Sequence, residues 1–276
     1  MRPVSLDIDA RAAVGRWLVA VGAVLVGLAL LDWLVAWDGE GWPDAIRRLC
    51  NAAREDSLAS WVATVQAAGI AAVAWACWRV VREGDASPRR RVGWLVVALV
   101  TTWLAVDEGA RVHERLGTVV DAALRTARRD PQTGGVVGWL GRYPSYGWQL
   151  VVAPPLAAAA LFFLVFLGRE AGGGWARRAL WVGCALVGVA VALDFVEGLD
   201  REHPWNAYAH LAAGERFDDW SRRRFGTGAY ATTLHLGRVV EELIELWAGA
   251  LFLGVLVACL FRAAPEIRLR ARTGDA

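Results

Sequence analysis

Residues 14–37 read VGRWLVAVGAVLVGLALLDWLVAW, an apolar run that only Arg16 and Asp32 interrupt. A helix needs about 20 mostly apolar residues to cross the hydrocarbon core of a bilayer. This run is longer than the apolar core of a cleaved signal peptide, and Arg11 precedes it. We therefore expect residues 14–37 to form an uncleaved membrane anchor.

Five further apolar stretches follow along the chain of 276 residues, which is 56% hydrophobic and 21% charged with a mean hydropathy of +0.35. This composition excludes a disordered chain and is more apolar than that of an ordinary soluble domain. No internal repeat or linker separates the stretches, so we predict a single domain over residues 1–276. The expected fold is all-α, an integral membrane bundle of six transmembrane helices with an amphipathic interfacial helix. The predicted spans cover about residues 14–37, 61–81, 92–114, 148–167, 179–199 and 236–261.

Two long connections join these spans, at about residues 107–147 and 198–238. Apolar residues recur at helical spacing in the first connection, which predicts the amphipathic helix. The second connection shows no clear periodicity. The apolar positions of the first are Leu116, Val119, Val120, Ala123, Leu124 and Ala127.

Charge indicates how the bundle is oriented. The short connections at residues 79–91 and 168–178 are dense in arginine, and short basic loops stay in the cytoplasm. We therefore expect a bacterial inner (plasma) membrane protein with both termini in the cytoplasm. A net charge of +2 is too balanced to indicate nucleic acid as a partner, so the expected partner is the lipid bilayer itself.

Three groups of acidic and histidine residues lie at the ends of spans. Residues 107–114 read DEGARVHE, residues 194–203 read DFVEGLDREH, and residues 235–245 read HLGRVVEELIE. The third and fifth spans run in one direction and the sixth returns, so all three groups lie at the same membrane face. Under the predicted orientation this is the outer face.

An ionised carboxylate at membrane depth is costly unless it is paired, hydrated or functional. Carboxylates and imidazoles from several helices are typical of bundles that bind paired iron or manganese ions, although the usual Glu-x-x-His repeat is missing here. Such a carboxylate-rich set favours Mg, Mn or Fe over Zn. The candidate metal ligands are Asp107, Glu108, His113, Glu114, Asp194, Glu197, His235, Glu242 and Glu245. The candidate acid–base residues are Asp107, Glu108, Glu114, Glu242 and Glu245.

The DE-x4-HE element at residues 107–114 and the EE-x2-E element at residues 241–245 resemble those of uncharacterised multi-pass bacterial membrane proteins. The resemblance implies a six-helix inner-membrane protein and implies no activity.

Three functions are compatible with these patterns. The first is a divalent-metal-dependent enzyme that acts on a lipid or another apolar substrate at the outer face. The second is a proton- or cation-coupled transporter in which Asp194, Glu242 and Glu245 bind the coupling ion, although the inner halves of the spans offer few polar groups for a through-path. The third is a structural or accessory membrane subunit whose acids are only interfacial.

Overall fold

The computed structural model describes residues 9–37, 41–129 and 135–264, and this part of the chain is helical and contains no strand. Six of its helices are long and apolar enough to cross a membrane. The predicted all-α membrane bundle is thus confirmed. The six spans are α1 (Ala10–Leu31) with its continuation η1 (Asp32–Trp37), α3 (Leu58–Glu83), α4 (Pro88–Ala110), α7 (Trp148–Glu170), α8 (Trp175–Glu197) and α11 (Ala229–Ala263).

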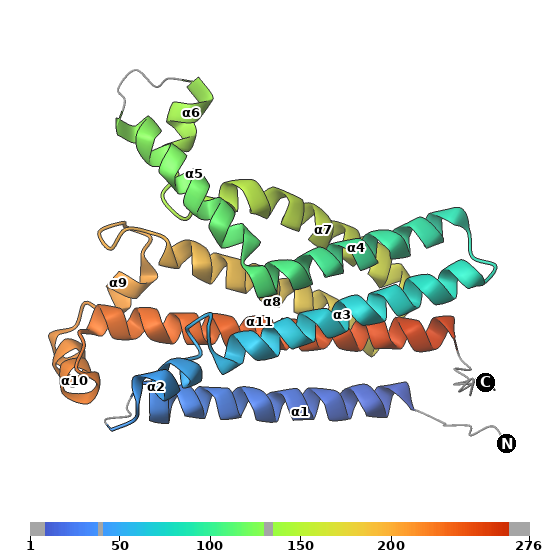
Figure 1. Ribbon diagram of the computed structural model, residues 1–276, viewed down its shortest axis with the longest axis horizontal. Coiled ribbons are helices and arrows are strands. Elements are labelled where there is room, and N and C mark those ends of the chain that lie inside the picture. Colours follow the sequence, from blue (N-terminus) through green and yellow to red (C-terminus); the bar gives the residue numbers. More distant parts are fainter. Residues whose placement is uncertain (1–8, 38–40, 130–134, 265–276) are drawn as a thin grey trace, which may run out of the picture.

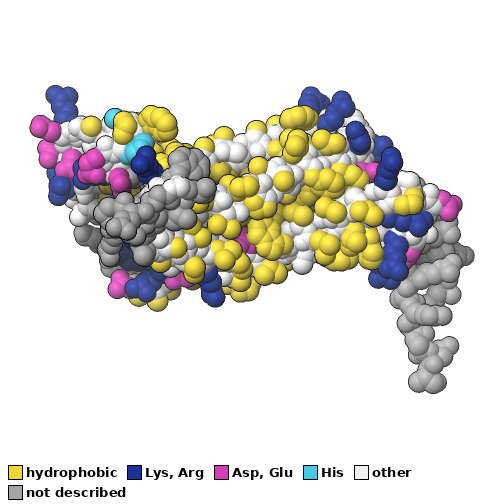
Figure 2. All heavy atoms as spheres, turned by 90° about the horizontal axis from the view of Figure 1, so that it is seen from above, with side chains coloured by type: hydrophobic (Ala, Val, Ile, Leu, Met, Phe, Trp, Pro, Cys, Tyr) yellow, Lys and Arg dark blue, Asp and Glu magenta, His cyan; other side chains and the backbone are white. Residues whose placement is uncertain are grey.

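The spans lie side by side along the long axis of the molecule (Figure 1). We call the end at which α1 begins and α11 ends the inner end, and α3 connects to α4 there too. The opposite, outer end carries the shorter helices. Figure 2 shows arginine side chains gathered at the inner end, acidic side chains mostly at the outer end, and an apolar band between them. The outer-end helices are α2 (Asp44–Cys50), α5 (Val112–Arg129), α6 (Gly135–Leu140), α9 (Ala207–Leu211) and α10 (Glu215–Phe225).

The central element is α11, which packs against α1, α3 and α8. The inner half of the bundle is filled by apolar side chains, and Trp94, Leu180 and Val255 are completely buried there. Water has no polar surface to follow through this packed region. The inner half is therefore a closed core.

At the inner end, α4 is fastened to α7. The carboxylate of Glu170 accepts hydrogen bonds from Arg90, at 2.8–3.0 Å, and from the indole Nε1 of Trp94, at 3.1 Å. One residue from Trp94, Gly93 lies directly against the ring of Phe166, where a Cβ atom would overlap it. Helix α4 starts just before this contact because Ser87 caps its first turn and Pro88 fits the first helical position.

The third span differs from the expected continuous helix over residues 92–114. Helix α4 ends at Ala110, because Arg111 adopts a left-handed conformation (φ 54°, ψ 48°), and α5 starts at Val112. The predicted amphipathic helix is α5 itself. In the second long connection, where no periodicity is visible, the chain forms the two short helices α9 and α10.

Candidate functional site

The joint between α4 and α5 is organised by one carboxylate. Asp107, buried at the end of α4, accepts a hydrogen bond from the backbone N–H of His113 at 2.8 Å through its Oδ1 atom. Its other oxygen, Oδ2, lies 2.8 Å from Nδ1 of the same histidine. Asp107 thus caps the first turn of α5 and orients the imidazole, which compensates for the left-handed Arg111 between them.

The second ring nitrogen of His113 points away from Asp107. Its Nε2 atom lies 3.8 Å from the Glu114 carboxylate, and the edge of the ring meets Trp148. Burial alone would lower the pKa of His113, but the hydrogen bond and charge of Asp107, with Glu114 and Glu245, outweigh it and raise that pKa above 6.5. The pair is an orienting carboxylate and a basic imidazole, which suits proton transfer.

Further carboxylates of α4 and α5, and carboxylates of two other helices, α8 and α11, lie near this pair. The Glu245 carboxylate of α11 lies within electrostatic range of Glu108, Asp194 and His113. Glu242 in turn lies within range of Glu108 and Glu114. Helices α4, α5, α8 and α11 therefore bring their acidic side chains to one region, which we call the acidic cluster. Its members are Glu108, His113, Glu114, Asp194, Glu241, Glu242 and Glu245.

Asp194 is held by a neutral chain of donors from α7 and the segment before it. The amide Nε2 of Gln149 donates to Asp194 at 2.6 Å, and the hydroxyl of Tyr143 donates to the amide oxygen at 2.5 Å. Burial, with the nearby charge of Asp194, raises the pKa of Tyr143, so its hydroxyl stays protonated. This chain fixes the carboxylate while adding no positive charge.

Glu197, a predicted ligand, has its own partners. Arg238 of α11 donates to it at 2.6 Å and the hydroxyl of Tyr146 donates to it at 2.8 Å. Burial, followed by the charge of Glu197, raises the pKa of Tyr146. The nearly buried carboxylate of Glu197 is thus paired with a partly exposed arginine and a phenol, and it forms an ion pair beside the acidic cluster.

His235, also a predicted ligand, belongs to a different contact. Its Nε2 atom lies 2.9 Å from Oδ2 of Asp32, the first residue of η1, and both side chains are buried. The ring of Trp37 covers the imidazole, with ring centroids 3.8 Å apart. The other Asp32 oxygen accepts a hydrogen bond from the backbone N–H of Ala52 at 2.9 Å. His235 therefore fastens α11 to α1.

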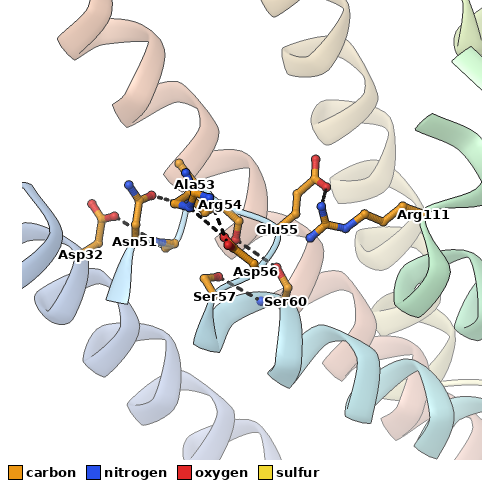
Figure 3. A network of polar contacts seen from close by, with 10 residues as sticks. Asp32, Asn51, Ala53, Arg54, Glu55, Asp56, Ser57, Ser60 and Arg111 are labelled. Atoms are coloured by element: carbon orange, nitrogen blue, oxygen red, sulfur yellow. Dashed lines mark hydrogen bonds and ion pairs between the residues drawn. The ribbon is translucent and has the colours of Figure 1, made fainter. Parts of the chain in front are cut away.

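The loop of residues 51–57 connects that contact with the α4–α5 joint (Figure 3). At one end of the loop, the backbone N–H of Ala52 bonds to Asp32. At the other, Glu55 forms an ion pair with Arg111, the left-handed residue. Burial, followed by the neighbouring Glu55, raises the pKa of Glu114 to about 7.

The residues do not fit the divalent metal expected from the sequence. Among the residues that the structure describes, no group of three or more His, Cys, Asp and Glu side chains is placed to hold a metal ion. The predicted ligands divide into the Asp107–His113 pair, the Glu197–Arg238 pair, the Asp32–His235 pair and separate carboxylates. We derive no chemistry from Mg, Mn or Fe here.

A family model described as a domain of unknown function (DUF8692) matches residues 17–263. The chain belongs to this family. The matched range covers five spans in full, the first span from Trp17 onward, and every residue of the acidic cluster. Comparison with curated proteins and with solved structures finds no significant match.

Several residues of the site escape prediction from the sequence. Gln149, Tyr143 and Tyr146 are neutral, and neither their spacing nor their residue type marks them as partners of acids on α8. Glu55 lies in a loop that has no acidic neighbour except Asp56. Asp32 is the exception, because a carboxylate inside an apolar span is itself a signal.

Proposed function

We propose that the protein is a membrane-embedded enzyme that performs acid–base chemistry at the outer end of the bundle, on a lipid or another apolar substrate. The observation that carries this proposal is the Asp107–His113 pair, whose second imidazole nitrogen lies 3.8 Å from Glu114 of α5, with Glu245 of α11 nearby. An imidazole oriented by a carboxylate is a common general base in enzymes. The chemistry proposed here uses the side chains alone.

The proposed roles follow from the contacts. Nε2 of His113 takes a proton from water or from a substrate hydroxyl, and Asp107 stabilises the imidazolium that forms. A carboxyl group of the acidic cluster supplies a proton to the leaving group. Glu108 and Glu242 are the candidates for this acid, because no hydrogen-bond or ion-pair partner among the described residues engages them.

A substrate from the membrane has a lateral route to the acidic cluster. Glu245 is exposed although it lies within the apolar sequence of α11. A carboxylate in this place is reached from the lipid side, which supports a substrate that dissolves in the bilayer.

Transport through the protein has less support. A coupled transporter needs polar groups that continue toward the other membrane face. The inner half is instead filled by side chains such as Trp94, Leu180 and Val255, none of which is exposed. This favours a site that serves one membrane face over a transport path. We also propose that the acids have a role beyond that of an inert accessory subunit.

We also propose that the protein resides in a bacterial inner membrane with both termini in the cytoplasm. Exposed arginines such as Arg89, Arg169 and Arg178 at the inner end support this orientation. The acidic cluster then faces the outside of the cell.

The enzyme proposal is tested with purified protein in nanodiscs made from a total bacterial lipid extract, analysed by mass spectrometry over time. We expect one lipid species to be consumed and a product to accumulate. His113→Gln slows the turnover by about a hundredfold or more, since general base catalysis contributes about that factor. His210→Gln, at an exposed histidine of the same end, is the matched control. Equal turnover in both variants, or none in the wild type, would contradict the proposal.

A further inference from the structure

The acidic cluster holds more carboxyl groups than its neighbouring cations can pair with. The nearby arginines are engaged elsewhere, because Arg111 binds Glu55 and Arg238 binds Glu197. His113 is paired with Asp107. Within the described residues, no hydrogen-bond or ion-pair partner engages the four remaining glutamates, which are Glu108, Glu241, Glu242 and Glu245.

The arrangement of these carboxylates indicates what kind of cation they suit. They interact electrostatically, as Glu245 does with Glu108 and Asp194. Among the described residues, no three acidic or histidine groups are nevertheless placed to hold one metal ion. An alkylammonium group does not need three converging ligands, because each of its N–H groups can donate to a single carboxylate.

A second, independent observation comes from Tyr208 of α9. Its side chain is 5% exposed, and its hydroxyl is buried with no hydrogen-bond partner. Buried tyrosine hydroxyls almost always have a partner. The ring and hydroxyl lie directly over Gly237 of α11, where a Cβ atom would overlap them.

The position of that hydroxyl links it to the cluster. Glu241 follows Gly237 by one helical turn, so both lie on the same face of α11. Burial, followed by the charges of Glu241 and Glu197, raises the pKa of Tyr208 to about 12, which keeps the hydroxyl protonated. An unused phenol beside an unpaired carboxylate forms a recognition pair for an N–H donor, because the phenol oxygen and the carboxylate can both accept from it.

Apolar surface adjoins these groups. Val240 on α11 is 49% exposed and Val106 on α4 is 54% exposed, and each directly precedes an acidic residue of the site. An alkyl chain on this surface would leave its head group at the carboxylates. A phosphate beside the ammonium would be repelled by the same carboxylates, so zwitterionic phospholipids are disfavoured.

We infer that the acidic cluster binds the ammonium head group of an amine-bearing amphiphile that carries no phosphate, with Glu241, Glu245 and Tyr208 as its recognition residues. This inference rests on the proposed function, since it names the substrate class of the same site.

The test measures binding of dodecylammonium to the full-length protein in dodecyl maltoside, by native mass spectrometry and tryptophan fluorescence. Dodecanol and dodecyl sulfate, which have the same chain, are the comparison ligands. We expect dodecylammonium to bind at least about tenfold more tightly than dodecanol, as expected when an ammonium group meets several carboxylates away from water. Dodecyl sulfate should bind least.

Variants separate the site from nonspecific partition into the detergent. Glu241→Gln and Glu245→Gln should each weaken dodecylammonium binding by about tenfold, and Tyr208→Phe should weaken it severalfold. Glu83→Gln removes the same charge at an exposed inner-end position and should change nothing. Size-exclusion profiles and melting temperatures confirm that each variant is folded.

Several results would overturn the inference. Equal affinities for dodecylammonium and dodecanol would do so, as would wild-type binding in all three site variants. Stoichiometric MgCl₂ or MnCl₂ that displaces the probe would assign the site to an inorganic cation instead. Turnover in the nanodisc assay without selective probe binding would reject this inference alone. Selective binding without turnover would reject the enzyme and leave the binding site in place.

Discussion

His235 and Asp32 are separated by 203 positions in the chain, yet Nε2 of the histidine lies 2.9 Å from Oδ2 of the aspartate. Only 2% of Asp32 and 8% of His235 are exposed. The contact joins the first span to the last, and the same carboxylate holds the backbone of Ala52. The closed arrangement of α1, the 51–57 loop and α11 thus depends on one side chain.

Asp32→Ala should destabilise the protein strongly. The substitution leaves His235 buried without its partner and frees the Ala52 N–H, and breaking a buried pair costs about 3 kcal/mol or more. Thermal unfolding in dodecyl maltoside measures the effect. Asp44→Ala, at an exposed position on α2, is the control and should unfold like the wild type. Equal melting temperatures for the two variants would show that the contact is unimportant for stability.

The Asp107–His113 contact predicts a pH effect. Because Asp107 raises the pKa of His113, the stability from this pair is complete below the ordinary histidine value of 6.5 and is lost as pH rises through the higher folded value. Asp107→Asn should lower the pKa of His113, as measured by NMR of ¹⁵N-histidine-labelled protein. An unchanged titration would mean that other groups set the pKa.

Glu114 predicts a second pH effect through its contact with Glu55. Its pKa is raised to about 7, so folding favours the protonated form, and the stability that this proton provides is lost as pH rises from 4.5 through about 7. Glu114→Gln cannot ionise and should therefore reduce the fall in melting temperature between pH 5 and pH 8. A fall as large as that of the wild type would show that the ionisation of Glu114 does not cause it.

Alanine substitutions at Gly93 and Gly69 compare a tightly packed glycine with one that has open space around it. A Cβ atom at Gly93 would overlap the ring of Phe166, whereas a Cβ atom at Gly69 meets nothing within 4 Å. Gly93→Ala should destabilise the bundle by about 1–3 kcal/mol through overpacking. Gly69→Ala should be neutral or stabilise by up to about 1 kcal/mol, since alanine favours helix. Chemical or thermal unfolding compares the two, and equal stabilities would exclude a tight α4–α7 contact.

The orientation is tested with single cysteines at exposed positions of the two ends. A membrane-impermeant maleimide should label Glu202→Cys on intact cells. Asp85→Cys should be labelled only after the cells are permeabilised. The native cysteines at positions 50, 77 and 259 are buried, so they give little background. The reverse labelling pattern would invert the proposed topology.

The six spans were predictable because bilayer thickness imposes a length and a composition that the sequence shows directly. That the three acidic groups lie at the same membrane face was also predictable, because successive spans cross the membrane in opposite directions. The break at Arg111 was not predictable, since arginine rarely takes a left-handed conformation and the cause is a side-chain contact between Asp107 and the next helix.

Helical periodicity also placed on one face of α11 side chains that contact different helices in the structure. His235, Arg238 and Glu242 lie on one broad face of α11, but that face is wide enough to touch several helices. His235 therefore meets α1, Arg238 meets α8, and Glu242 lies near α4 and α5. Which neighbour each side chain meets depends on the order of the helices around α11. The hydropathy pattern of the sequence does not predict that order.

The length of α11 has a consequence for the surroundings of Glu245. With 35 residues the helix is about 52 Å long, well beyond the roughly 30 Å of a hydrocarbon core. The depth of its carboxylates below the lipid head groups is then determined by the acyl chains around it. Lipids with shorter chains would bring Glu245 closer to the aqueous phase and lipids with longer chains would draw it deeper, so that membrane thickness becomes a control on how this side chain ionises.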